Sequence, residues 1–169
     1  MNWDEFKAAA PELAGLGEGL FERAGVVLVG TIRKDGSPRI SPVEPLITDG
    51  ELFLGMMWQS LKALDLLRDP RCTIHSAVSD REGAEGEFKL YGRAVDVHDL
   101  EVRRRYGDAL YQKIGFRPEE ANYHLFSVDI FSAAFFITQG DYRVLKRWKI
   151  GETAREFRQD GDGNLTLVS

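Results

Sequence analysis

The sequence contains one cysteine and three histidines among its 169 residues. A single cysteine excludes an intrachain disulfide and is typical of a reducing compartment. No apolar run reaches the length that crosses a bilayer. The first residues are acidic, where a secretory signal would be basic and then apolar. We therefore expect a cytoplasmic protein that is not inserted in a membrane.

Basic residues are also in the minority, and the formal net charge is −5. This balance argues against non-specific binding to nucleic acid, which needs a basic surface. The charge is uneven, because residues 1–24 carry five acids against two bases, whereas residues 141–158 carry six bases against three acids. The 43% hydrophobic content is ordinary for a globular protein, and the length suits one domain with its own core.

Common catalytic and metal-binding motifs are missing as well. His75, His98 and His124 have no metal-ligand spacing, so we expect no metal site. The chain has no Walker loop and no glycine-rich dinucleotide motif. Cys72 lies in an apolar alternation that is typical of packing. If the protein is an enzyme, a bound cofactor therefore carries the reaction.

What the sequence does have is a series of short apolar segments joined by tight turns. Strands are expected at residues 26–32, 38–48, 51–58, 71–78, 87–97, 123–130, 133–139 and 142–150, with helices within 1–25 and at 60–68 and 99–113. Residues 164–169 form a possible last strand. This pattern predicts a mainly β protein with flanking helices (α+β), built as an antiparallel barrel. We expect one domain over 1–169, with the N-terminal helices in 1–25, the barrel in 26–150 and a tail in 151–169.

The helix expected at 60–68 begins with Ser60 and Lys62. A lysine in the first turn has the wrong charge for the helix dipole. An anion held by the backbone N–H groups, the serine hydroxyl and the ammonium group would remove this conflict. The ordinary interpretation is a capping serine and a solvated lysine. On spacing alone that interpretation is favoured, because Ser-x-Lys is a weak pattern.

Residues around this helix allow a second interpretation. Trp58 and Gln59 precede it; the default place for the tryptophan is the core, but an aromatic ring and an amide beside an anion also suit a flat heteroaromatic phosphate ester. Arg39 and Ser41 share a face of the strand at 38–48, whose prolines require it to lie at a sheet edge or to be bulged. Trp148 is either a barrel-closing aromatic residue or a wall of the same pocket.

In this order the segments resemble the pyridoxamine 5′-phosphate oxidase-like family, the FMN-binding split β-barrels. The resemblance spans about Val26 to Trp148 and rests on "GTIRKDGSPRISPV", "DGELFLGMMWQSLKALDLLRDPR" and "FKLYGRAVDV". It implies a homodimer with FMN at the subunit interface, and hydride transfer through flavin N5 to or from a small substrate. The cofactor contacts that it implies are Arg39, Ile40, Ser41, Met56, Met57, Trp58, Gln59, Ser60, Lys62, Glu87 and Trp148.

The chain also departs from the oxidase itself. Leu61 stands where the oxidase has a second phosphate cation, and "KIGETAREFRQDGDG" lacks the histidine of its substrate motif. Oxidation of pyridoxamine phosphate is therefore not the expected activity. Two alternatives stay open: a reductase that uses the deazaflavin F420, and a non-catalytic flavin or haem protein in which His75 or His124 is a ligand. The sequence assigns neither a substrate nor a catalytic residue.

Overall fold

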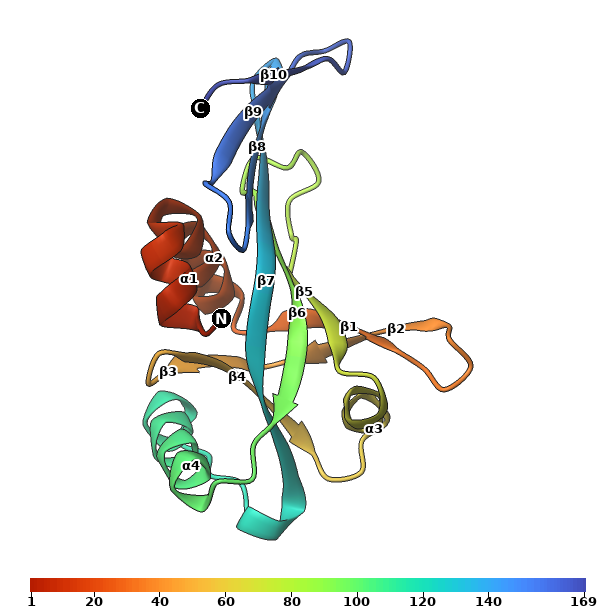
Figure 1. Ribbon diagram of the computed structural model, residues 1–169, viewed down its shortest axis with the longest axis vertical. Coiled ribbons are helices and arrows are strands. Elements are labelled where there is room, and N and C mark those ends of the chain that lie inside the picture. Colours follow the sequence, from red (N-terminus) through yellow and green to blue (C-terminus); the bar gives the residue numbers. More distant parts are fainter.

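The computed structural model describes the whole chain, residues 1–169, apart from the side chain of Ala121. The described chain forms a ten-stranded antiparallel sheet flanked by four α-helices (Figure 1). The helices are α1 (Trp3–Ala9), α2 (Pro11–Ala24), α3 (Leu61–Arg68), α4 (Leu100–Ile114) and the 3₁₀ turn η1 (Glu120–Asn122). The strands are β1 (Val27–Ile32), β2 (Pro38–Val43), β3 (Pro45–Thr48), β4 (Glu51–Met57), β5 (Arg71–Ser76), β6 (Glu87–Asp96), β7 (Tyr123–Gln139), β8 (Tyr142–Lys149), β9 (Arg155–Gln159) and β10 (Leu165–Leu167).

The strand order is β10-β9-β8-β7-β6-β5-β1-β2, and β4 pairs with both β3 and β7. The 17-residue strand β7 is the axis of this arrangement (Figure 1). Its first part pairs with β4 and its last part with β8, while β6 runs beside it with a register shift at Tyr91/Gly92. Such a shift bends and twists a sheet locally. As a result, β7 belongs both to the barrel and to the arm formed by β8, β9 and β10.

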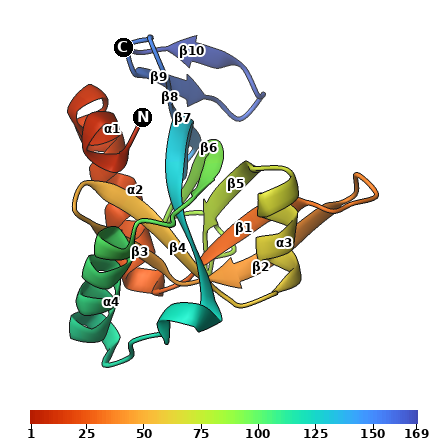
Figure 2. The same ribbon diagram turned by 60° about the horizontal axis from the view of Figure 1, so that its bottom comes forward.

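The core lies between the sheet and the N-terminal helices. Trp3, Phe6 and Phe21 from α1 and α2 pack on one another and on Phe88 of β6, with ring centroids 5.5–6.5 Å apart. Trp148 of β8 joins them at 5.0 Å from Phe6. Helix α3 lies over the β1–β2 side of the barrel and α4 beside β3 and β4 (Figure 2).

The structure confirms the mainly β, antiparallel class with flanking helices. Three segments differ from the expectation. Residues 38–48 form two strands interrupted at Glu44, residues 123–139 form one strand rather than two, and β9 lies in the expected tail. Within the described part of the chain, no helix combines the length and apolarity that crossing a membrane requires.

Candidate functional site: the junction of β4, α3 and β2

A tight turn connects the end of β4 to the start of α3. Gln59 has φ 57°, in the left-handed region that non-glycine residues seldom adopt. Its N–H donates to Nε2 of His124 at 3.3 Å, and the N–H of Ser60 donates to the carbonyl of Met57 at 3.1 Å. These hydrogen bonds hold the turn and place Ser60 directly before the first residue of α3. The turn and the first residues of the helix (58–63) form the β4–α3 corner.

Ser60 does not cap α3 in the way the ordinary interpretation requires. Its side chain accepts no hydrogen bond from the helix, and its Oγ is buried without a partner in the described chain. The backbone N–H groups of Leu61, Lys62 and Ala63 find no acceptor among the described residues either. Buried polar groups without partners are rare in native proteins. A ligand oxygen at this helix end would satisfy both the hydroxyl and the N–H groups.

Lys62 brings a positive charge to the same end of α3. Its half-buried side chain crosses to the edge strand β2, where Nζ donates to the carbonyl of Pro42 at 3.0 Å. Lys62 also lines a cavity of about 300 Å³ between β2, β4, α4 and η1. The other lining residues are Pro42, Val43, Glu44, Gly55, Met56, Met57, Tyr106, Leu110, Phe116, Pro118, Asn122 and Tyr123. This cavity is mostly apolar and aromatic, with the ammonium group at its edge.

Arg39 is held by a buried carboxylate. Its Nε lies 2.7 Å from Oδ2 of Asp65, which also accepts from Oγ1 of Thr31 at 3.0 Å, and Nη2 of Arg68 lies 3.0 Å from Oδ1. Burial acts to raise the pKa of Asp65, but the hydrogen bonds from Arg39, Arg68 and Thr31 outweigh it and lower the pKa below its ordinary value. Two arginines therefore share one carboxylate, which leaves a net positive charge beside α3.

Trp58 is not a core residue, in contrast to its default assignment. Its side chain is 53% exposed, and its ring stacks on His124 with centroids 4.5 Å apart and planes 12° apart. His124 is itself buried, and its Nε2 already accepts the hydrogen bond from Gln59. The stack therefore presents a flat aromatic surface at the turn before α3.

The other expected contacts near this turn come from β2 and β4. Alternation in β2 turns Arg39 and Ser41 toward one side and leaves Ile40 exposed on the other. Met56 is buried, whereas Met57 is exposed and lines the cavity. These residues lie close to the start of α3.

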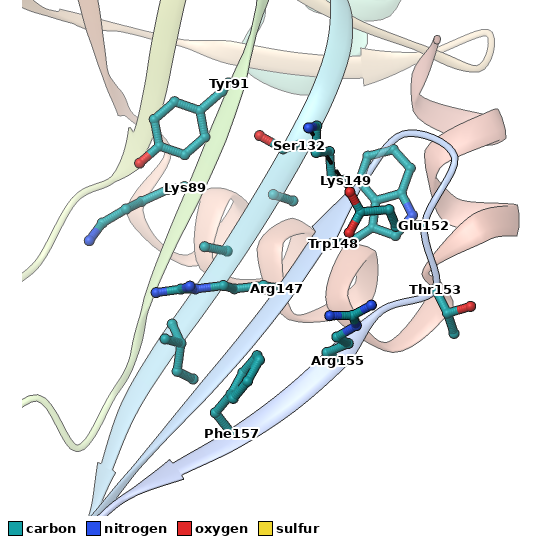
Figure 3. Close-up of a pocket in the computed structure, with 13 residues that line it drawn as sticks. Lys89, Tyr91, Ser132, Arg147, Trp148, Lys149, Glu152, Thr153, Arg155 and Phe157 are labelled. Atoms are coloured by element: carbon teal, nitrogen blue, oxygen red, sulfur yellow. Dashed lines mark ion pairs between the residues drawn. The ribbon is translucent and has the colours of Figure 1, made fainter. Parts of the chain in front are cut away.

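Glu87 and Trp148 lie elsewhere in this chain. β5 and β1 separate β6, which carries Glu87, from β2. Glu87 pairs with Lys89 at 2.7 Å and approaches Nε2 of His75 at 3.5 Å. Trp148 is 3% exposed and packs against Phe6 in the core. Trp148 also borders a cavity of about 490 Å³ formed by β6, β7, β8 and β9 (Figure 3).

Sequence reasoning missed residues that support the corner, both on α3 itself and on other elements. The pair Asp65 and Arg68 has the i, i+3 spacing of a helical ion pair, so its signal was available. His124 and Tyr106 reach the site from β7 and α4, and no local pattern connects them to it. Only the tertiary fold brings these residues to the turn.

Neither a metal cluster nor a reactive thiol accompanies this site in the described chain. No group of three His, Cys, Asp or Glu side chains there is placed to hold a metal ion. Burial raises the pKa of the Cys72 thiol to about 12, so the thiol stays protonated and unreactive at neutral pH. The corner therefore offers hydrogen-bond donors and positive charges that suit an anion, together with an aromatic surface.

An antiparallel barrel in which a strand runs through a tight turn into a short helix belongs to the class of small split-barrel proteins. Residues 18–136 match the model of the pyridoxamine 5′-phosphate oxidase family, and the chain belongs to this family. A search of curated proteins finds no match.

Solved structures share the fold at low sequence identity. A Clostridium acetobutylicum protein related to general stress protein 26 of B. subtilis aligns with TM-score 0.60 and 19% identity, over 82% of this chain and 96% of that one. A haem binding protein from Mycobacterium smegmatis aligns with TM-score 0.64 and 18% identity, over 82% of this chain and 58% of that one. A putative 5-nitroimidazole antibiotic resistance protein from Bacteroides thetaiotaomicron aligns with TM-score 0.58 and 15% identity, over 70% and 80%. At these identities the likeness shows the split-barrel fold alone.

Proposed function

We propose that the protein binds FMN at the β4–α3 corner and acts as a flavin-dependent oxidoreductase. The observation that carries the proposal is the buried, unpartnered hydroxyl of Ser60 beside the free N–H groups of α3 and the charge of Lys62. Leaving such a hydroxyl unpaired costs about 1–3 kcal/mol. A phosphate oxygen that accepts from it would offset this cost and complement the dipole of α3.

Different residues of the corner would bind different parts of the cofactor. Ser60, Lys62 and the first N–H groups of α3 would hold the phosphate. Arg39, which shares the carboxylate of Asp65 with Arg68, would add positive charge. Trp58 and the exposed edge of β2 would flank the ring system. When bound, FMN supplies hydride transfer through its N5, and the chain's own residues bind and orient it.

We also propose that the protein is a homodimer. Leu28, Ile40 and Tyr91 are 37%, 72% and 44% exposed and lie on one face of the sheet, because Ile40 and Tyr91 share the cross-strand row through Gly30 and Thr73. Exposed apolar patches of this kind mark interaction surfaces. A second copy on this face agrees with the arrangement that the resemblance implies, in which the cofactor lies between subunits.

The two alternative cofactors have different support. F420 carries a phosphate that the same corner would accept, so the corner itself does not distinguish it from FMN. Haem binding has the name of the M. smegmatis protein in its favour. However, ligation through Nε2 of His124 would remove the acceptor of the Gln59 N–H and open the turn before α3. At His124, this hydrogen bond therefore supports a phosphate-bearing flavin rather than haem.

A titration of FMN into purified protein tests the proposal. Absorbance and mass measurement of the released cofactor first identify what co-purifies. We expect Lys62→Ala to weaken FMN binding roughly ten- to a hundredfold, the range for a charge-assisted hydrogen bond. Lys113→Ala is a matched control, since Nζ of Lys113 also donates to a proline carbonyl, at Pro45. Wild-type protein that neither retains nor binds FMN would reject the function, and an unchanged affinity in Lys62→Ala would reject this site.

A further inference from the structure

A cleft of about 510 Å³ lies between the C-terminal half of α3 and the start of α4. The start of β7 runs between these two helices (Figure 2). The turn after β4, the end of β6 and η1 also border the cleft. Leu28, Ile40 and Tyr91, which form the proposed dimer face, do not line it. We refer to it as the α3–α4 cleft.

Three large apolar side chains from separate elements are exposed in this cleft. Trp58 is 53% exposed, Leu67 of α3 is 44% exposed and Leu100 of α4 is 69% exposed. Stacking on the buried imidazole of His124 holds the ring of Trp58 in place. Exposed apolar side chains that gather in one concave site are typical of a ligand-binding surface. About half of a fixed indole is therefore available to an occupant of the cleft.

The positive groups of the cleft are already neutralised. Among the described residues that line it, Arg103 is the only lysine or arginine. Its guanidinium group pairs with Glu120 and also donates to three backbone carbonyls. The carboxylate of Asp99 caps the positive end of α4 by accepting from two backbone N–H groups. The cleft therefore offers no uncommitted positive charge to an anionic occupant.

One carboxylate in the cleft lacks a permanent positive partner. Asp96 is half-buried at the end of β6, and within the described chain its one ion-pair partner is Nε2 of His98 at 3.0 Å. His98 is exposed and carries a charge only when it is protonated. While this imidazole is neutral, the carboxylates of Asp96 and Glu120 face the single guanidinium group of Arg103. The cleft then has a net negative charge beside its apolar surface.

We propose that the α3–α4 cleft binds a small organic cation with a flat apolar body. Asp96 holds its ammonium group, and its body packs against Trp58, Leu67 and Leu100. Tryptophan is the aromatic side chain that attracts cations most strongly, so Trp58 favours the same charge as the carboxylate. The site shares Trp58 with the β4–α3 corner but none of the phosphate contacts, and it does not depend on the proposal for FMN.

Calorimetric titration of the intact protein with phenethylammonium, hydrocinnamate and ammonium chloride tests the inference. The titration is done at pH 8, where imidazole groups are ordinarily neutral. We expect phenethylammonium to bind at least ten times more tightly than hydrocinnamate, which has nearly the same body with the opposite charge. The ammonium ion alone should bind more weakly than phenethylammonium, because it lacks an apolar body.

Substitutions locate the bound cation in the cleft. Asp96→Asn should weaken phenethylammonium binding about tenfold or more, because it removes the charged acceptor. Leu67→Ala should weaken it about threefold or more through lost apolar contact. Asp108→Asn is the matched control, since it removes the same charge from a part of α4 that does not line the cleft. The affinities of Asp108→Asn and of Lys62→Ala at the β4–α3 corner should stay within twofold of the wild type.

Thermal denaturation separates ligand binding from a folding defect. Because the partner of Asp96 is exposed, Asp96→Asn should melt at nearly the wild-type temperature. Phenethylammonium should raise the melting temperature of the wild type and of Asp108→Asn more than that of Asp96→Asn. A wild type that does not bind phenethylammonium, or binds hydrocinnamate equally well, would overturn the inference, as would unchanged affinity in Asp96→Asn. A tenfold loss in Lys62→Ala would also overturn it, because the cation would then occupy the corner and not the cleft.

Discussion

Asp65 holds the two arginines that give the β4–α3 corner its positive charge. It is 4% exposed, and its carboxylate binds Arg39, Arg68 and Thr31 on three different elements. Removing one partner of a buried charged network leaves the other partners with unsatisfied groups. Asp65 therefore supports both the stability of this region and the position of Arg39.

We expect Asp65→Asn to lower the free energy of unfolding by roughly 2–3 kcal/mol at neutral pH. The pKa of Asp65 is lower in the folded protein, so its contribution is present above the pKa of the unfolded chain and is lost as the pH falls through the folded-state pKa. The difference between wild type and variant should therefore shrink below about pH 4. Urea denaturation at pH 7, 5 and 3.5 measures it.

Asp108 provides a control for this prediction. It also pairs with two arginines, Arg104 and Arg117, but its side chain is 38% exposed. Exposed ion pairs contribute about 0–1 kcal/mol, so Asp108→Asn should change the free energy of unfolding by less than about 1 kcal/mol. A loss in Asp108→Asn as large as that in Asp65→Asn would show that burial of Asp65 is not the cause.

Single residues were the least predictable level of this structure. The sequence indicated that Ser60 and Lys62 open a helix, and the helix is there. It did not indicate that the serine hydroxyl stays unpartnered. Nor did it indicate that Trp58 lies outside the core, because its ring stacks on His124 from the distant strand β7. Local patterns predict the position of a side chain along the chain and not its tertiary partners.

At the level of elements, the contact between α2 and β6 depends on one glycine. A Cβ atom built on Gly17 would lie 2.4 Å from the ring of Phe88, which is fully buried. Gly15 lies in the same helix, is exposed, and would place its Cβ in open space. The two glycines therefore have opposite roles, although sequence alone treats them alike.

We expect Gly17→Ala to destabilise the protein by about 1–3 kcal/mol, because overpacking forces α2 away from the sheet. Gly15→Ala should instead stabilise it by up to about 1 kcal/mol through higher helix propensity. Thermal or urea denaturation of the two variants measures the difference. If Gly17→Ala were as stable as Gly15→Ala, the helix would not be packed against Phe88 as closely as described.

The remaining differences between expectation and structure also arise at element level. Polar Asp129 and Ser132 interrupt the apolar alternation of 123–139, yet β7 continues because β6 pairs along it across a bulge. Strand β9 reads "REFRQ", which has too many charges for a sequence-based strand prediction, but β8 and β10 pair with it on both sides. In both cases pairing with neighbouring strands overrides local preference.

For the whole molecule, the exposed apolar face tests the proposed homodimer. Ile40 is 72% exposed, and a charge there would have to be buried in a subunit interface. We expect Ile40→Glu to sediment as a monomer at concentrations where the wild type is a dimer. Leu100→Glu is the control, since Leu100 is 69% exposed at the start of α4, away from this face. A monomeric wild type, or dimeric Ile40→Glu, would contradict the proposed interface.

The stack of Trp58 on His124 has a spectroscopic consequence. Trp3 and Trp148 are 1% and 3% exposed in the core, so their emission should be blue-shifted and shielded from quenchers in solvent. Trp58 is 53% exposed, and its ring centroid lies 4.5 Å from that of the His124 imidazole. One indole in this chain thus reports on the β4–α3 corner and two report on the fold, and the same emission spectrum contains separate signals for occupation of the corner and for unfolding of the core.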